Sequence, residues 1–189
     1  LGDKLSVDAM TSGKMHYGRV GYEATVNGMG SRLGASYSDL SYELGKEYKA
    51  LDAEGKAQQA SIWLNQPVLL SNRSEVLLNA QYDYKQLEDD IGVANVYRHR
   101  DVHVGRLSIQ AAQYDNFAGG GLNQLNISND FGQVKYQNAA AKKADQATAQ
   151  TQGSFYRAHL NLSRLQNLGL SATQLYTGIQ AQYSPDNLD

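Results

Sequence analysis

The sequence predicts an all-β protein, a transmembrane antiparallel β-barrel of which this chain would supply about nine strands. Three observations lead to this prediction: apolar and polar residues alternate over long stretches, turn and loop sequences separate these stretches, and tyrosine and glycine are abundant. Alternation matters because successive side chains of a strand point to opposite faces. A tilted strand crosses a bilayer in roughly 9 to 11 residues, so stretches of this length can face lipid.

The clearest alternation lies in residues 74–86, SEVLLNAQYDYKQ. One face carries apolar side chains such as Val76 and Leu78, and the other carries polar ones such as Glu75 and Asn79. This period of two is typical of an amphipathic strand and not of a helix. Its length favours a strand that spans a membrane.

The composition narrows the classes of partner. The 17 basic and 19 acidic residues give a net charge of −2, which favours no nucleic acid as a partner. Cysteine is absent, so disulfides and thiolate metal sites are excluded. No run of 18 apolar residues occurs, and the mean hydropathy of −0.53 is compatible with strands that are half polar. The 13 tyrosines, against only 2 prolines, suit the two membrane interfaces.

The predicted strands follow one another with turns or loops between them. We expect a bulge near Ser38 and another between Val104 and Leu107, because the apolar phase changes there. We expect Pro67 to stop ladder pairing, and the Ala-rich stretch 133–153 to form a helical turn or stay mobile. Short connections should alternate with long loops at 46–56 and 86–95. The strands are expected at 5–10, 16–26, 31–45, 57–66, 74–86, 98–112, around Leu125 to Phe131, 154–165 and 170–183.

Two sets of side chains follow from the alternation. The polar set would line a wet lumen, either as a mixed-charge channel wall or as cross-strand ion pairs that stiffen the barrel: Arg19, Glu23, Glu75, Asn79, Gln81, Asp83, Lys85, Arg157, His159 and Gln180. The apolar set would face outer-membrane lipid: Val20, Tyr22, Val76, Leu78, Tyr82, Leu160, Leu162, Leu175 and Ile179.

No pattern in the chain indicates catalysis or a cofactor. His99, Asp101 and His103 would share one strand face, but further ligands for a metal ion are lacking, so a water-facing strand is the favoured interpretation. The glycines at 119–121 are followed by no Lys-Ser/Thr pair, and we interpret them as a turn and not a phosphate loop. We therefore predict no enzyme, no metal and no cofactor.

Two other classes of protein remain open at this point. A soluble β-sandwich could also alternate, although the strand lengths, the tyrosines and the polar faces rich in Gln, Asn, Arg and Glu argue against it. A passive solute channel or a ligand-binding barrel could be built on the same pattern. An odd number of strands does not close an antiparallel barrel, so we expect an open arc of a larger one.

A series of segments in order resembles one family. These are SYELGKEYKALDAEGKAQQASIWLNQPVLLSNRSEVLLNAQYDYKQLEDD, QYDNFAGGGLNQLNIS, GSFYRAHLNLSRLQNL and GIQAQYSPDNLD, and together they resemble the two-partner secretion transporters (TpsB), the haemolysin secretion/activation proteins of Gram-negative bacteria. The resemblance covers nearly the whole chain. It implies a multi-pass 16-stranded barrel in the bacterial outer membrane that secretes a large unfolded partner protein, a haemolysin, adhesin or contact-dependent toxin, without ATP.

The same resemblance implies which part of such a protein this is. Residues 1–189 would belong to the C-terminal barrel domain, from about its third strand to its eleventh. The periplasmic POTRA domains, the plug helix, the inward-folded loop with its Val-Arg-Gly-Tyr-like tip and the closing strands would lie outside this chain. No functional residue of the family is carried over to a position here.

Overall fold

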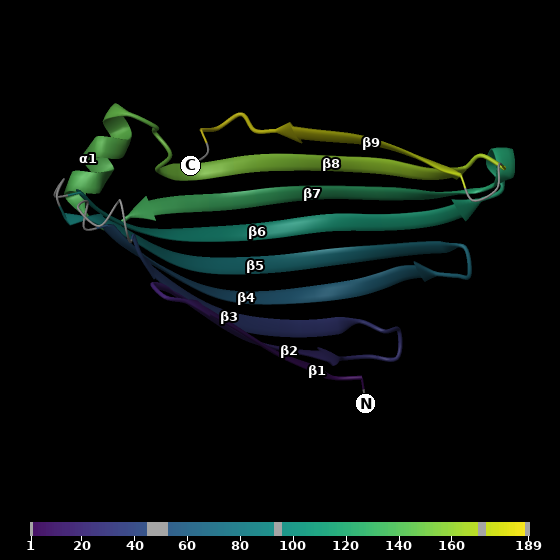
Figure 1. Cartoon of the computed structure of the whole chain (residues 1–189), viewed down its shortest axis with the longest axis horizontal. Helices are drawn as coiled ribbons and strands as arrows, with labels where there is room; N and C mark the ends of the chain where they lie inside the picture. The colour runs from purple at the N-terminus through teal and green to yellow at the C-terminus, as the bar shows by residue number, and fades with distance from the viewer. Residues whose placement is uncertain (1, 45–52, 93–95, 170–172, 188–189) are drawn as a thin grey trace.

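The computed structural model describes residues 2–44, 53–92, 96–169 and 173–187. In these residues nine β-strands form one antiparallel sheet, and each strand pairs with its neighbours in the sequence (Figure 1). The predicted all-β antiparallel fold is confirmed. The strands are β1 Lys4–Ser12, β2 Met15–Thr25, β3 Arg32–Glu43, β4 Ala53–Leu70, β5 Ser74–Ile91, β6 Val96–Asp115, β7 Gly121–Tyr136, β8 Gly153–Asn167 and β9 Gln174–Tyr183.

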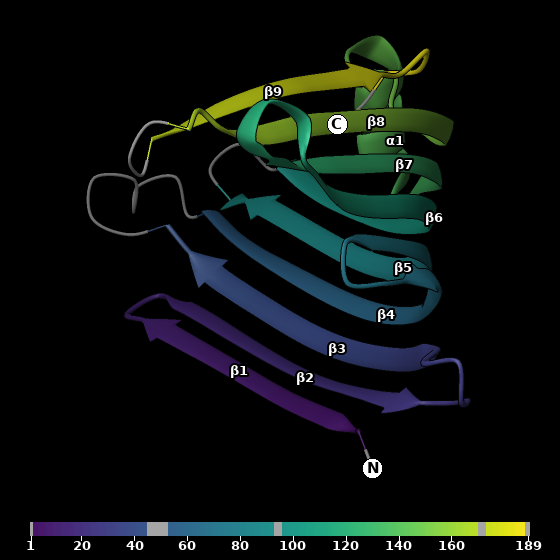
Figure 2. The ribbon, with the colours of Figure 1, turned by 90° about the vertical axis from the view of Figure 1, so that its right-hand side faces the viewer.

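The sheet curls along its strand order, from β1 at one edge to β9 at the other (Figure 2). Within the described residues only four apolar side chains are buried, Ala53, Val104, Val134 and Ala141, against eight polar or charged ones. A soluble domain buries mainly apolar side chains, so this burial is inverted. No helix in the described part of the chain is long and apolar enough to cross a membrane.

The connections at the two ends of the sheet differ as expected in part. At one end lie the turns 26–31, 71–73 and 116–120, the last of which holds the short 3₁₀ helix η3, Phe117–Gly119. At the other end β7 and β8 are joined by residues 137–152, whereas β1 and β2 are joined by only Gly13 and Lys14. The expected alternation of short and long therefore fails at β1–β2. Parts of the loops expected at 46–56 and 86–95 lie outside the described residues.

Several strands are longer than the sequence indicates. β5 runs on to Ile91, so the charged residues 86–91 belong to the strand and not to a loop. Side chains on β6 pair with these carboxylates: Arg100 lies 3.6 Å from Asp89, and the His99 ring lies 3.1 Å from Asp90. Cross-strand pairs of opposite charge stabilise a sheet. Likewise residues 53–56 belong to β4, and 133–136 to β7.

The two predicted bulges are wrong. The pairing of β3 with β2 and β4 is continuous through Ser38, and that of β6 with β5 and β7 is continuous from Val104 to Leu107. The apolar phase changes there for another reason. Toward the loop end of the sheet the face opposite to Val20 and Leu78 itself becomes apolar, with residues such as Leu40 and Val102.

Pro67 does not stop the ladder. It pairs with Leu77, and β4 continues to Leu70 after a register shift between Pro67 and Leu69. Proline lacks the N–H that a ladder needs, and the extra residue of the bulge, Val68, is left without a partner and 61% exposed. This bulge was not predicted from the sequence.

A helix in the long connection settles one of the open alternatives. The Ala-rich stretch forms α1, Ala139–Ala147, at the loop end of β6 and β7 (Figure 1). Its last turn is held by Asp145, whose carboxylate accepts hydrogen bonds from the Thr151 backbone at 3.0 Å, the Thr151 hydroxyl at 2.7 Å and the Gln152 backbone at 2.9 Å. Burial raises the pKa of Asp145, but these hydrogen bonds outweigh it and hold the pKa below its ordinary value.

Candidate functional site: the inner wall of the sheet

The register divides the side chains into an outer and an inner face. Directly paired residues share a face, so the face assigned to one row across the sheet determines the face of all the other rows. We call the face that contains Asp83 and Asp130 the inner face, because side chains crowd there and both carboxylates are buried. The opposite face, with Val20 and Leu78, is the outer face.

Every predicted site residue falls on the face that its set requires. The ten polar residues, from Arg19 to Gln180, occupy the inner face, and the nine apolar residues, from Val20 to Ile179, occupy the outer face. That the inner face meets water in a passage, and the outer face lipid, stays a prediction.

The outer face presents a continuous band of exposed apolar side chains. Leu107 is 56% exposed, Ile62 49% and Ile179 62%, and Ile62 and Ile179 have apolar neighbours in their rows, Ala35 and Tyr82 for the first and Leu162 for the second. Aromatic side chains gather toward the loop end of this band, where Phe131 and Tyr156 lie with ring centroids 5.3 Å apart. A soluble monomer rarely leaves an apolar area of this extent uncovered. The arrangement matches an apolar belt with an aromatic girdle.

The inner face carries a charged belt across β2 to β8, which we define as Glu23, Asp83, Arg106, Asp130 and Arg157. At its centre the carboxylate of Asp130 is 0% exposed and lies between two guanidinium groups. Arg106 donates to it at 2.6 and 3.0 Å, and Arg157 at 2.7 and 3.2 Å. Both hydrogen bonds from Arg106 reach separate oxygens, the bidentate geometry that makes such pairs strong.

The acidic groups in the rest of the belt are also paired. Glu23 lies 2.7 Å from the Nε of Arg32 and accepts a hydrogen bond from the Trp63 indole at 2.8 Å. Asp83 accepts from Gln81 at 2.9 Å and from Gln59 at 3.2 Å. The carboxylates of the belt therefore reach their partners within the wall itself.

Three glycines of the inner face lie under aromatic rings of the strand beside them. A Cβ on Gly34 would come within 2.3 Å of the Trp63 ring, and a Cβ on Gly132 within 2.1 Å of Phe155. In both cases the ring belongs to the directly paired residue, and Gly55 stands in the same relation to Tyr42. The rings therefore lie flat against the wall and not out from it.

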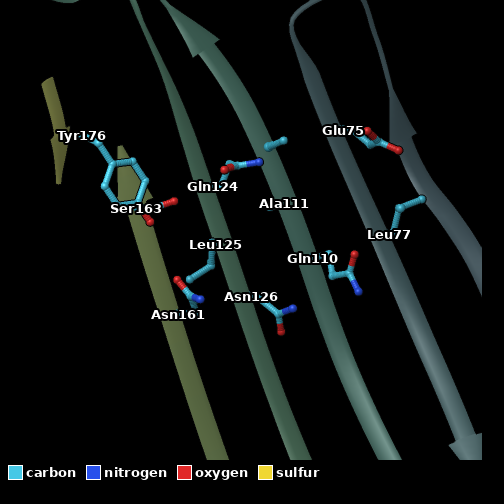
Figure 3. A pocket seen from close by; sticks show the side chains of 11 residues that line it. Glu75, Leu77, Gln110, Ala111, Gln124, Leu125, Asn126, Asn161, Ser163 and Tyr176 are labelled. Atoms are coloured by element: carbon cyan, nitrogen blue, oxygen red, sulfur yellow. The ribbon is translucent and has the colours of Figure 1, made fainter. Parts of the chain in front are cut away.

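A row of carboxamides lies nearer the short-turn end of the inner face. Gln110, Asn126, Asn161 and Gln180 are direct cross-strand partners on β6, β7, β8 and β9. We call these four residues the amide row. The first three line a hollow of about 380 Å³, together with Glu75 (Figure 3).

The remaining candidates do not form sites. His99, Asp101 and His103 share one face, as expected, but it is the outer face and not the polar inner one. They turn to different partners: His99 to Asp90, and His103 to the Tyr82 hydroxyl at 2.7 Å. Across the described residues no three His, Cys, Asp or Glu side chains are grouped to hold a metal ion. Gly119 and Gly120 adopt positive φ of 96° and 92°, as a turn needs.

Sequence reasoning missed Arg106, Asp130 and Trp63 as inner-face residues. Arg106 and Asp130 lie directly opposite each other, but their strands were assigned without a register. A signal was present in the alternation. Once Leu107 and Phe131 are assigned to the outer face, the residues directly before them, Arg106 and Asp130, fall on the inner face. Pairing those two strands residue by residue would have brought the two charges together.

The sheet and its two faces define the class of protein: an arc of an antiparallel β-barrel of the outer-membrane type. Comparison with known proteins supports this. No protein-family model matches the chain. The heme/hemopexin transporter protein HuxB of Haemophilus influenzae, strains Rd and 86-028NP, is 23% identical over 190 residues, which cover 100% of this chain and 33% of each relative.

Among solved structures, CdiB from Acinetobacter baumannii has a TM-score of 0.60 at 19% identity, covering 93% of this chain and 30% of that one. The likeness shows a shared fold. This chain spans about a third of the length of the curated relatives that it matches. The predicted resemblance to the barrel wall of a two-partner secretion transporter is confirmed by these comparisons.

Proposed function

We propose that residues 1–189 are part of the C-terminal barrel domain of an outer-membrane pore, which secretes a large partner protein from the periplasm to the cell surface without ATP. The observation that carries the proposal is the two-sided wall: a polar inner face and an exposed apolar outer face on the same nine strands. The relative HuxB, whose similarity extends over the whole of this chain, is named a transporter. This name supports the proposal that the protein is not an enzyme.

The inner face suits a polypeptide in transit. The acidic groups of the charged belt are paired within the wall, so these carboxylates are not free to hold an extended chain in transit. The outer face would meet outer-membrane lipid, since its band is apolar where a bilayer requires it. Because no nucleotide site is indicated by the sequence, folding of the partner outside would supply direction to the export.

The experiment is removal of the full-length gene from its own host. We expect one large protein to disappear from the culture medium and cell surface and to return when the wild-type gene is restored. POTRA-like domains in the full-length product would agree with this result. An unchanged set of external proteins, together with altered uptake of small solutes, would contradict secretion and favour a passive solute channel.

A further inference from the structure

The amide row differs from the rest of the inner wall in the state of its polar groups. Within the described residues, none of the side-chain amides of Gln110, Asn126, Asn161 and Gln180 hydrogen-bonds to another protein group, whereas the neighbouring row pairs Asn79 with Asn65 at 2.7 Å. All four side chains of the amide row are exposed. Their donors and acceptors are therefore open to whatever occupies the space in front of them.

Two hollows meet at this row. The hollow of about 380 Å³ over β5 to β9 (Figure 3) and a second hollow of about 440 Å³ over β7 to β9 are both lined by Asn126 and Asn161. Neighbouring strands are about 4.8 Å apart, so the four amides present hydrogen-bonding groups at regular intervals along this row. The small buried side chain of Ser163, beside the row, lines the first hollow and leaves room in it.

We propose that the extended backbone of the exported protein crosses the amide row on its way through the pore and hydrogen-bonds to these side chains. A carboxamide offers both donors and an acceptor, which matches the alternating N–H and C=O groups of an extended chain whatever its sequence. The amides carry no charge, so they select neither acidic nor basic segments. Each such hydrogen bond replaces one to water and is weak in net terms, which lets the chain move on.

This inference rests on the proposed function and names the residues that would contact its substrate. The first test places a photo-crosslinking side chain at Asn126 or Asn161 in the full-length transporter in its host membrane. Matched controls carry it at Ile127 or Leu162, the adjacent residues of the outer face. The probe is the exported protein found by gene removal, arrested in transit by a stably folded domain fused to its end.

We expect adducts with the arrested protein from positions 126 and 161 and none from 127 and 162. Adducts only with another segment of the transporter itself, or no adduct with the exported protein from positions 126 and 161, would overturn the inference while secretion stands. If gene removal reveals no exported protein, the proposed function fails instead. The two failures are therefore distinguishable.

The second test measures the contact directly. The full-length transporter in a planar bilayer is exposed to an uncharged, unstructured glycine–serine peptide, and the duration of its current blockades is recorded. Replacing Gln110, Asn126 and Asn161 by leucine removes the hydrogen bonds and should shorten the blockades several-fold. Replacing the same three by serine keeps a donor and acceptor and should shorten them much less. Equal durations in wild type and leucine variant would overturn the inference.

Discussion

The charged belt and the amide row lie on one face of the same strands, with Asp130 and Asn126 only four residues apart on β7. In the belt, Asp130 is fully buried and bonded by two arginines. In the amide row, Asn126 is exposed, and its side chain hydrogen-bonds to no other protein group among the residues that the structure describes. The buried carboxylate, which would cost much free energy if it were unpaired, is bonded within the wall. The exposed amide, which costs little without a protein partner, is left available for hydrogen bonding. The wall thus separates what holds its own strands together from what is available to its contents.

The comparison requires that the two faces meet different surroundings, and charge placed on each face tests this. We predict that Leu160→Arg, at a position whose row neighbours Ile127 and Ala181 are apolar, destabilises the barrel by about 2–4 kcal/mol, the cost of arginine near mid-membrane. The adjacent inner variant Asn161→Arg should cost far less. Heat-modifiable electrophoretic mobility of the full-length protein measures both. Equal losses would show that the outer face does not meet lipid.

Removing the central charge of the belt should have the next largest effect. Asp130→Asn leaves Arg106 and Arg157 side by side without their carboxylate. Breaking a buried ion pair costs roughly 3–5 kcal/mol, and we expect about 3 kcal/mol because the arginine side chains are 37% and 30% exposed. The same thermal assay measures the loss, and the reversal potential in a planar bilayer should shift toward anion selectivity.

The control for this variant adds Arg157→Gln to Asp130→Asn. The double variant restores the net charge of the cluster, so its ion selectivity should return toward wild type even where stability does not. If Asp130→Asn changes neither thermal stability nor selectivity, the belt does not hold the wall in the way described.

The glycines under aromatic rings should give a smaller loss. Gly34→Ala would force the Trp63 ring off the wall, because a Cβ there lies 2.3 Å from it. Overpacking of this kind costs about 1–3 kcal/mol, and the indole would lose its hydrogen bond to Glu23. A shift of Trp63 fluorescence and a lower unfolding temperature report the change. Gly18→Ala, where nothing lies within 4 Å, should leave both unaltered.

The faces could be predicted from the sequence, but the strand ends and the pairing of charges within the belt could not. The faces on which residues such as Glu75 and Val76 lie follow from the pleat of one strand, so no knowledge of the neighbouring strands is needed. By contrast, β5 continues past Gln86 because Asp89 and Asp90 find basic partners on β6. Such partners depend on register, and alternation within one strand does not determine it.

The false bulges have a related cause. An inserted residue and a change in the polarity of a face both reverse the apolar phase, and a single strand cannot distinguish them. Leu40 is apolar and inner where Tyr37 is apolar and outer, yet the ladder between them is regular. The true bulge, at Pro67 to Leu69, was hidden because apolar residues continue on both sides of it. Only the pairing of β4 with β5 reveals the extra residue.

Asp145 extends the comparison to a buried carboxylate that has neutral donors and no arginine. Its pKa lies below the ordinary value, so its contribution to loop stability is present above the ordinary pKa of about 3.9 and is lost as pH falls through the depressed folded value. Asp145→Asn should loosen residues 137–152 by about 1 kcal/mol, the net value of a hydrogen bond. Limited proteolysis of the full-length protein measures this opening against pH.

At neutral pH we expect faster cleavage within residues 137–152 of the variant, and little change in the thermal stability of the barrel. The wild type should approach the variant only when acid protonates Asp145, since both then lack the carboxylate. Lys143→Gln, on the same helix, provides a matched control because the hydrogen-bond partners of the Asp145 carboxylate within the described residues are Tyr136, Thr151 and Gln152 and do not include Lys143. If the barrel loses stability together with the loop, α1 supports the wall. The neutral donors to Asp145 would then stabilise the barrel as the arginines that bind Asp130 do.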